Sequence, residues 1–159
     1  MSDSEGTAQF DLDTITIHKP KSLSFLDQWA ANYPSLDLAA IPDSHSTDGG
    51  LLSDSLEFAF GGDPESPIDD TTLNPTHQIT NDGVDDFLEI RYRRQVYAND
   101  RGITYSVEYS DQLRFDSWQI PDSTETQIIA IDSEFEQVTT QIPINADTHK
   151  FVRVRIGFE

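Results

Sequence analysis

The stretch from Ser46 to Pro64, STDGGLLSDSLEFAFGGDP, has the residue types and spacing of a calcium-binding loop that leads into a helix. Such a loop presents oxygen ligands at alternate positions, and a carboxylate at position twelve closes the coordination shell from the helix. With Glu57 as the closing carboxylate, Asp48 and Asp54 fall at ligand positions, and Leu52 falls where a backbone carbonyl is the ligand. These residues predict a calcium site at the start of a helix.

Three positions of the stretch depart from a calcium loop. Ser46 at the first position is a weak ligand, and Gly50 at the fifth has no side chain. Leu51 stands where a glycine normally makes the sharp turn. Gly49 or Gly50 can make that turn one or two positions early. The pattern is therefore complete in its helix and closing acid, and incomplete where the loop would bind the ion.

The neighbouring acids leave two interpretations of this stretch open. In the first, a calcium ion is bound, and Asp43 and Asp63 supply further carboxylates beside it. In the second, Asp48 and Ser53 cap a helix and the other acids are solvated. Calcium is the one cofactor that the sequence suggests.

Two short helices are predicted to position these residues. The first lies in SLSFLDQWAANY, residues 22–33, where Ser22 or Ser24 is placed to cap it. The second lies in LLSDSLEFAF, residues 51–60, and the glycine pair that follows is typical of a helix end.

Five later segments alternate apolar and polar side chains, as strands with one buried face do. In the first of them, Leu88, Ile90 and Tyr92 alternate with charged residues. A turn is predicted at 99–102, between the first two segments. The pattern predicts a mainly β fold: an antiparallel β-sandwich of fibronectin type III or immunoglobulin-like type, preceded by a short two-helix acidic segment. The segments are FLEIRYRR, ITYSVEYS, TQIIAID, EQVTTQIPI and KFVRVRIGF.

Composition divides the chain into four parts. Residues 1–22 hold a polar tail and a predicted strand at 10–18, FDLDTITIH. That strand is either an edge strand of this domain or the remnant of an upstream domain, and we favour the edge strand because a chain that folds tends to keep the strands it pairs with. A helix–acidic loop–helix segment is predicted at 23–64, an acidic connecting loop at 65–86 and the β-sandwich at 87–159.

The charge of the chain restricts its partners. It has 29 acidic and 10 basic residues and a formal net charge of −19. Such a surface repels nucleic acid and anionic lipid, so we expect neither as a partner, and no apolar run is long enough for membrane insertion. Most arginines lie in the later strands, where Glu89 and Glu108 are expected to form charge pairs with Arg91, Arg93 or Arg153.

The sequence offers no pattern typical of catalysis. Its four histidines are scattered, without an H-x-H or H-E-x-x-H spacing, and there is no G-x-S-x-G motif. Cysteine is absent, which excludes disulfides and thiolate catalysis. We therefore expect the chain not to be an enzyme.

Aromatic residues form a second candidate site, because flat rings stack on the faces of sugar rings. Tyr105 and Tyr109 share a face with Val107 and are more readily interpreted as core. Trp118 is a candidate ligand-binding residue, although its place resembles that of the packing tryptophan in a fibronectin-type sandwich. Tyr97, near a turn, is the best exposed candidate.

Five pieces of the chain in order resemble a C-terminal accessory module of large secreted proteins from Verrucomicrobia, Planctomycetes and related marine bacteria. The resemblance covers roughly residues 23–158, and the pieces are FLDQWAANYP, DGGLLSDSLEFAFGGDP, FLEIRYRR, ITYSVEYSDQLRFDSW and KFVRVRIGF. That module has an F-x-x-W helix, an acidic loop-helix similar to thrombospondin type 3 repeats and dockerin loops, and a Y-x-V-E-x-S hairpin. This chain departs from it at Ser46, Gly50, Leu51 and Asp54. The resemblance implies no catalytic activity.

These observations favour a non-catalytic, calcium-stabilised accessory or structural module at the C-terminus of a secreted or cell-surface protein. Its partners would be the neighbouring domains of the parent protein. One alternative is a carbohydrate-binding module attached to a polysaccharide-active enzyme, with a glycan as partner. Others are a C-terminal sorting domain and a self-assembling or adhesive unit.

Overall fold

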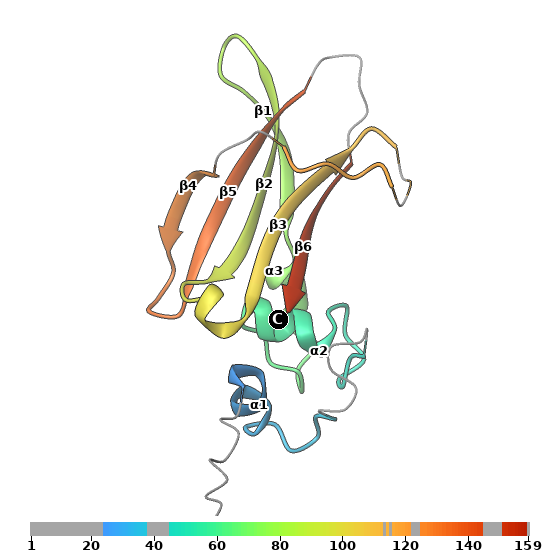
Figure 1. Cartoon of the computed structure of the whole chain (residues 1–159), viewed down its shortest axis with the longest axis vertical. Helices are drawn as coiled ribbons and strands as arrows, with labels where there is room; N and C mark the ends of the chain where they lie inside the picture. The colour runs from blue at the N-terminus through green and yellow to red at the C-terminus, as the bar shows by residue number, and fades with distance from the viewer. Residues whose placement is uncertain are drawn as a thin grey trace, which may run out of the picture.

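The chain is mainly β in the computed structural model, which describes residues 24–37, 45–112, 114, 116–121, 125–144 and 151–158. Within these residues, six strands and three short α-helices follow one another, with one 3₁₀ turn between β2 and β3 (Figure 1). The predicted strand at 10–18 lies outside the described residues. The elements are α1 (Phe25–Ala30), α2 (Asp54–Phe60), α3 (Asp70–Leu73), β1 (Thr76–Asn81), β2 (Asp86–Gln95), η1 (Asn99–Arg101), β3 (Ile103–Ser110), β4 (Glu125–Ala130), β5 (Phe135–Ile144) and β6 (Phe151–Phe158).

The strands form two antiparallel sheets that share a core. One sheet has the order β1-β2-β5-β4, and the other pairs β3 with β6. Leu88, Ile90 and Tyr92 of β2 pack with Val138 of β5 and with Val107 of β3 across the space between the sheets. The predicted alternation in β2 is confirmed, and so is the mainly β, antiparallel class. The fibronectin or immunoglobulin-like type of sandwich stays a prediction.

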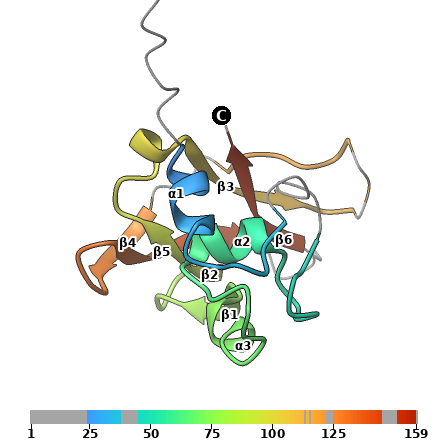
Figure 2. The same cartoon turned by 90° about the horizontal axis from the view of Figure 1, so that it is seen from below.

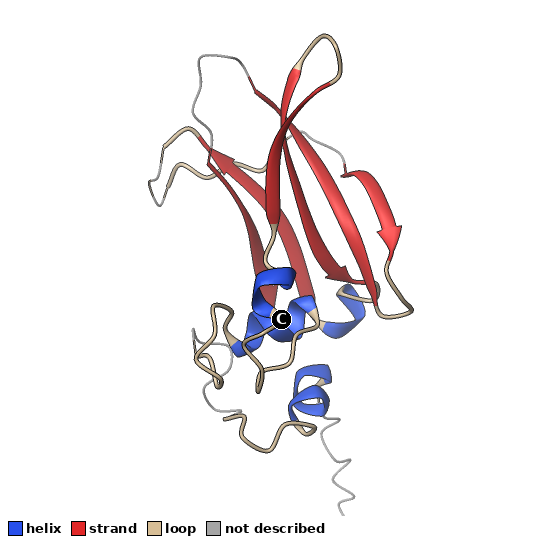
Figure 3. Cartoon of the chain, turned by 180° about the vertical axis from the view of Figure 1, so that it is seen from behind, coloured by secondary structure: helices blue, strands red, loops and turns tan. Residues whose placement is uncertain are grey.

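The helices gather at one end of the sheets, as Figures 2 and 3 show. Phe58 and Phe60 of α2 are buried against side chains of β3 and β6. The carbonyls at the end of α2 are bonded to the sheets: the Gln95 side chain donates to the Phe58 carbonyl at 2.6 Å, and the Tyr105 hydroxyl donates to the Ala59 carbonyl at 2.5 Å. These two bonds satisfy carbonyls that a helix leaves without a partner, and they attach α2 to both sheets.

Local sequence explains where α1 and α2 begin and end. Ser24 is one of the two serines predicted to cap this helix, and it does cap α1, where it forms a capping box with Asp27. Gly61 ends α2 in the left-handed conformation, with φ of 79°. A side chain at Gly61 would also collide with the ring of Phe135, so glycine is required there for two reasons.

One prediction about connections is wrong and another is confirmed. The segment 65–86 is not only a loop, because it contains α3 and also β1, which pairs with β2 from Thr76 opposite Arg91 to Asn81 opposite Asp86. The turn predicted at 99–102 is confirmed, because η1 and a left-handed Gly102 lie between β2 and β3. It carries the chain from β2 in one sheet to β3 in the other, while β2 pairs with β1 and β5.

None of the helices in the described ranges is long and apolar enough to cross a membrane.

Candidate metal centre

Three carboxylates from three separate segments meet beside α2. Asp48 comes from the loop, Glu57 from α2 and Asp70 from α3, and one oxygen of each lies within 4.8 Å of the others. Glu57 is 0% exposed and Asp70 is 1% exposed. The segment from His45 to Leu73 contains no lysine or arginine, so no ammonium or guanidinium group of its own can neutralise this cluster.

Asp48 and Asp70 each use one carboxylate oxygen to hold the loop. One oxygen of Asp48, Oδ1, accepts a hydrogen bond from the Gly50 amide at 2.7 Å. One oxygen of Asp70, Oδ2, accepts from the Leu51 amide and, at 3.0 Å, from the Leu52 amide. The loop turns at Gly49, which has φ of 76°, so the early turn that the sequence predicts is confirmed.

The remaining oxygens of the cluster have no hydrogen-bond partner among the described residues. These buried atoms are Oδ2 of Asp48, Oδ1 of Asp70 and both carboxylate oxygens of Glu57. A buried polar atom without a partner costs free energy, and a buried charge costs more. The arrangement therefore requires a positive charge, which either a metal ion or a proton can supply.

The pKa of Glu57 reflects the same requirement. Burial is the largest cause that raises it, followed by the charges of Asp48 and Asp70, and the pKa reaches about 8. The ordinary value is 4.5. A divalent cation that binds these oxygens would keep Glu57 ionised at neutral pH.

The structure brings together only part of the predicted ligand set. Asp48 and Glu57 meet as expected. Asp54 does not join them, because its two oxygens accept hydrogen bonds from the Thr47 amide at 2.8 Å and the Thr47 hydroxyl at 2.9 Å. The backbone carbonyl predicted as a ligand at Leu52 stays a prediction, while the side chain of Leu52 packs into an apolar cluster under α2. Asp43 lies outside the described residues.

Asp70 is the candidate ligand that the sequence did not reveal. It follows the loop-helix stretch, in a segment that was expected to be a connection. A Cβ placed on Gly50 would collide with the Asp70 carboxylate. Asp70 therefore occupies the space of the missing side chain at the fifth loop position. The signal that could have indicated it is the glycine itself, which leaves room for an acid from another segment.

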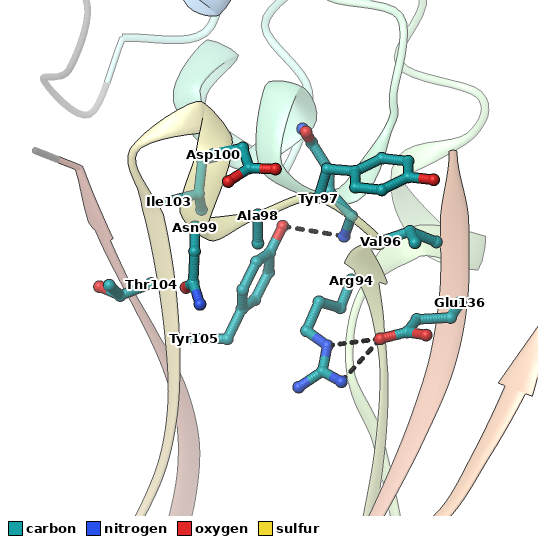
Figure 4. A pocket seen from close by; sticks show the side chains of 11 residues that line it. Arg94, Val96, Tyr97, Ala98, Asn99, Asp100, Ile103, Thr104, Tyr105 and Glu136 are labelled. Atoms are coloured by element: carbon teal, nitrogen blue, oxygen red, sulfur yellow. Dashed lines mark hydrogen bonds and ion pairs between the residues drawn. The ribbon is translucent and has the colours of Figure 1, made fainter. Parts of the chain in front are cut away.

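The two candidate aromatic residues line different pockets. Tyr97 is 55% exposed and lies at the edge of a pocket of about 450 Å³ where β2 and β3 meet η1 (Figure 4). Trp118 is half-buried under Arg153, whose guanidinium lies 4.0 Å from the centre of the indole ring. It borders a second pocket of about 540 Å³ together with Glu108. The structure thus does not bring the two rings to one site.

Comparison of the chain with protein-family models, with curated proteins and with solved structures finds no match. The resemblance to bacterial accessory modules therefore stays a prediction.

Proposed function

We propose that this chain is a non-catalytic accessory module of a secreted or cell-surface protein, and that a calcium ion bound by Asp48, Glu57 and Asp70 stabilises its helical end. The observation that carries the proposal is the set of four buried carboxylate oxygens without a hydrogen-bond partner among the described residues. They come from three segments and lie close enough together to share one ion.

The donor set favours calcium over other common ions. All the donors are carboxylate oxygens, which suit a hard cation, whereas zinc is usually bound by cysteine and histidine. Magnesium demands a near-ideal octahedral shell and usually keeps several waters. Calcium accepts varied geometry and bidentate carboxylates such as that of Glu57. In the extracellular setting that we propose, calcium modules work with dissociation constants of about 10⁻⁴–10⁻³ M, so a site of modest affinity would suffice.

The ion would link three separate segments of the chain. It would hold the loop, α2 and α3 together, and α2 is itself bonded to β2 and β3 through Gln95 and Tyr105. The helical end would then become a rigid continuation of the sheets. A rigid end suits a module whose partners are the neighbouring domains of a longer protein.

Thermal unfolding with calcium and with a chelator tests the proposal. At a calcium concentration about 100 times the dissociation constant, binding adds about 2.7 kcal/mol to the free energy of unfolding. For a chain of this size we expect Tm to rise by roughly 5–10 °C. An unchanged Tm in calcium would overturn the proposal.

Two charge-removing variants give the matched controls. Glu57→Gln keeps the shape of the side chain and removes its charge, so we expect it to abolish the calcium-dependent rise in Tm. Asp85→Asn removes one charge at an exposed turn between β1 and β2, and should keep the full rise. Equal responses of both variants would show that calcium acts through the general charge of the chain and not through this cluster.

A further inference from the structure

A second site, separate from the acid cluster, is suggested by the pocket at the end of β2 and β3. Its volume of about 450 Å³ lies within the range of roughly 300–1,000 Å³ that is usual for small-molecule sites. Figure 4 shows Tyr97 and Val96 on one side of the hollow, and Asn99 and Asp100 on the side of η1. Buried Ile103 anchors the start of β3 beside it.

The walls of the pocket are held rigid by contacts within the chain. Arg94 donates to Oε1 of Glu136 through Nε at 2.8 Å and through Nη2 at 2.6 Å, which joins β2 to β5. The Tyr105 hydroxyl accepts from the Gln95 amide at 3.3 Å and donates to α2. A site whose walls are fixed in this way loses little conformational freedom when a ligand binds.

The edge of the pocket combines an apolar ring with polar side chains. Val96 is 39% exposed and Tyr97 is 55% exposed, so two successive apolar residues face solvent at this edge. Asn99 and Asp100 are also exposed. An exposed ring can stack on the C–H face of a sugar ring, while an amide and a carboxylate can bind its hydroxyl groups.

The charge at the pocket excludes an anionic ligand. The positive charge of Arg94 is matched by Glu136, and Asp100 adds one negative charge at the edge. The chain as a whole carries a formal net charge of −19. Phosphates, sulfate esters and uronic acids would therefore be repelled, whereas a neutral ligand rich in hydroxyl groups would not.

We propose that this pocket binds a neutral saccharide, with Tyr97 stacking on a sugar ring and Asn99, Asp100 and Glu136 binding hydroxyl groups. The proposal is independent of the metal centre, because no residue of the acid cluster lines the pocket. The module would then both extend its parent protein and attach it to a glycan.

Affinity electrophoresis of the full chain tests this proposal. The gels contain a soluble neutral polysaccharide (dextran, galactomannan, xylan or mixed-linkage β-glucan), with alginate as the anionic comparison and calcium present throughout. We expect at least one neutral polysaccharide to slow the protein and alginate to have no effect. Retardation by alginate alone, or by none of the polysaccharides, would overturn the proposal.

Variants at the two aromatic residues locate the binding. Tyr97→Ala should weaken binding about tenfold or more, as the loss of a stacking ring does, while Tyr97→Phe should retain it. Trp118→Ala removes the ring of the other pocket and should leave retardation unchanged. Melting curves of each variant show that the fold is intact. Full binding by folded Tyr97→Ala, or its loss in folded Trp118→Ala, would place the sugar elsewhere and refute the assignment.

Discussion

The two sheets and the helical end accommodate buried acids in opposite ways. In the sheets, Glu89 pairs with Arg91 at 2.7 Å and Glu108 pairs with Arg153 at 2.6 Å, the second of these pairs across strands as the sequence predicts. In the helical end, Glu57 lies beside the carboxylates of Asp48 and Asp70 and has no hydrogen-bond partner among the described residues. The sheets carry their own counter-charges, whereas the helical end must obtain one from the medium.

Glu57 and Glu89 show the difference most clearly, because both are buried. Burial alone would raise the pKa of Glu89, but hydrogen bonds from Gln141, Gln78 and Arg91 hold it below its usual value. The pKa of Glu57 is raised, since nothing opposes burial and like charges reinforce it. Burial by itself therefore does not decide the ionisation of an acid. The hydrogen-bond donors and the charges around the carboxylate do.

The largest expected effect is a dependence of metal-free stability on pH. The pKa of Glu57 is about 8 in the folded chain, above its ordinary value of 4.5, so between these values the folded state holds one more proton than the unfolded state. Stability from this proton is complete below pH 4.5 and is lost as the pH rises through 8. The free energy of unfolding should fall by up to about 1.4 kcal/mol per pH unit in that window.

Denaturant unfolding in chelator at several pH values between 5 and 8 measures this slope. Calcium should flatten it, because the ion replaces the proton. The Glu57→Gln variant cannot titrate at this position, so its curve gives the pH dependence of stability that comes from all the other groups. A wild-type curve parallel to that of Glu57→Gln in chelator would contradict the prediction.

The next effect separates the two regions by removing one charge from each. Asp70→Asn keeps an oxygen that can accept from the Leu51 and Leu52 amides and removes a repulsive charge. We expect the free energy of unfolding in chelator to stay the same or rise by about 1 kcal/mol, and the gain from calcium to fall by about 2 kcal/mol.

The matched change in the sheets is Glu89→Gln. It breaks a pair with Arg91 and should lower the free energy of unfolding by about 1–2 kcal/mol, equally with calcium and with chelator. Calorimetry of both variants in both media gives the comparison. If Asp70→Asn also lost stability in chelator, the repulsion inferred for the cluster would be wrong.

The sequence predicts β2 from its alternation and misses β1 and α3. The alternation at 87–94 gives β2, because its inner side chains pack in the shared core. β1 has no such alternation, since most of its residues are exposed, and it is held by backbone bonds to β2 that any sequence can form. α3 has four residues, too few to show a helical period.

The same limit applies to the candidate metal centre. Asp48 and Glu57 follow from spacing, because both belong to one local loop-helix pattern. Asp70 comes from another segment and joins them only through the fold. Asp54 has the right spacing, but Thr47 satisfies its carboxylate, and spacing alone cannot weigh that competition. Sequence therefore predicts the two members of the cluster that belong to one local pattern, Asp48 and Glu57.

A smaller effect tests the connection between the two regions. Tyr105→Phe removes the hydroxyl that donates to the Ala59 carbonyl at the end of α2. The free energy of unfolding should fall by about 1–2 kcal/mol, because a partly buried carbonyl loses its partner. The calcium-dependent rise in Tm should persist, since the cluster is intact. A lost calcium response would show that the attachment of α2 to β3 positions Glu57.

The smallest effect lies within the sheets, at the two arginines that meet Glu108. Arg155 is 68% exposed in its side chain and lies 3.5 Å from Glu108, so Arg155→Gln should lower the free energy of unfolding by less than about 0.5 kcal/mol. Arg153 also stacks on Trp118, and Arg153→Gln should cost about 1 kcal/mol more than Arg155→Gln. Equilibrium unfolding at low and high salt distinguishes them, because salt screens the exposed pair and leaves the stacking contact largely intact. If both variants lowered the free energy of unfolding equally at high salt, the contact of Arg153 with Trp118 would add no stability. The sheets would then balance their acids by charge alone, and they would differ from the helical end in charge and not in packing.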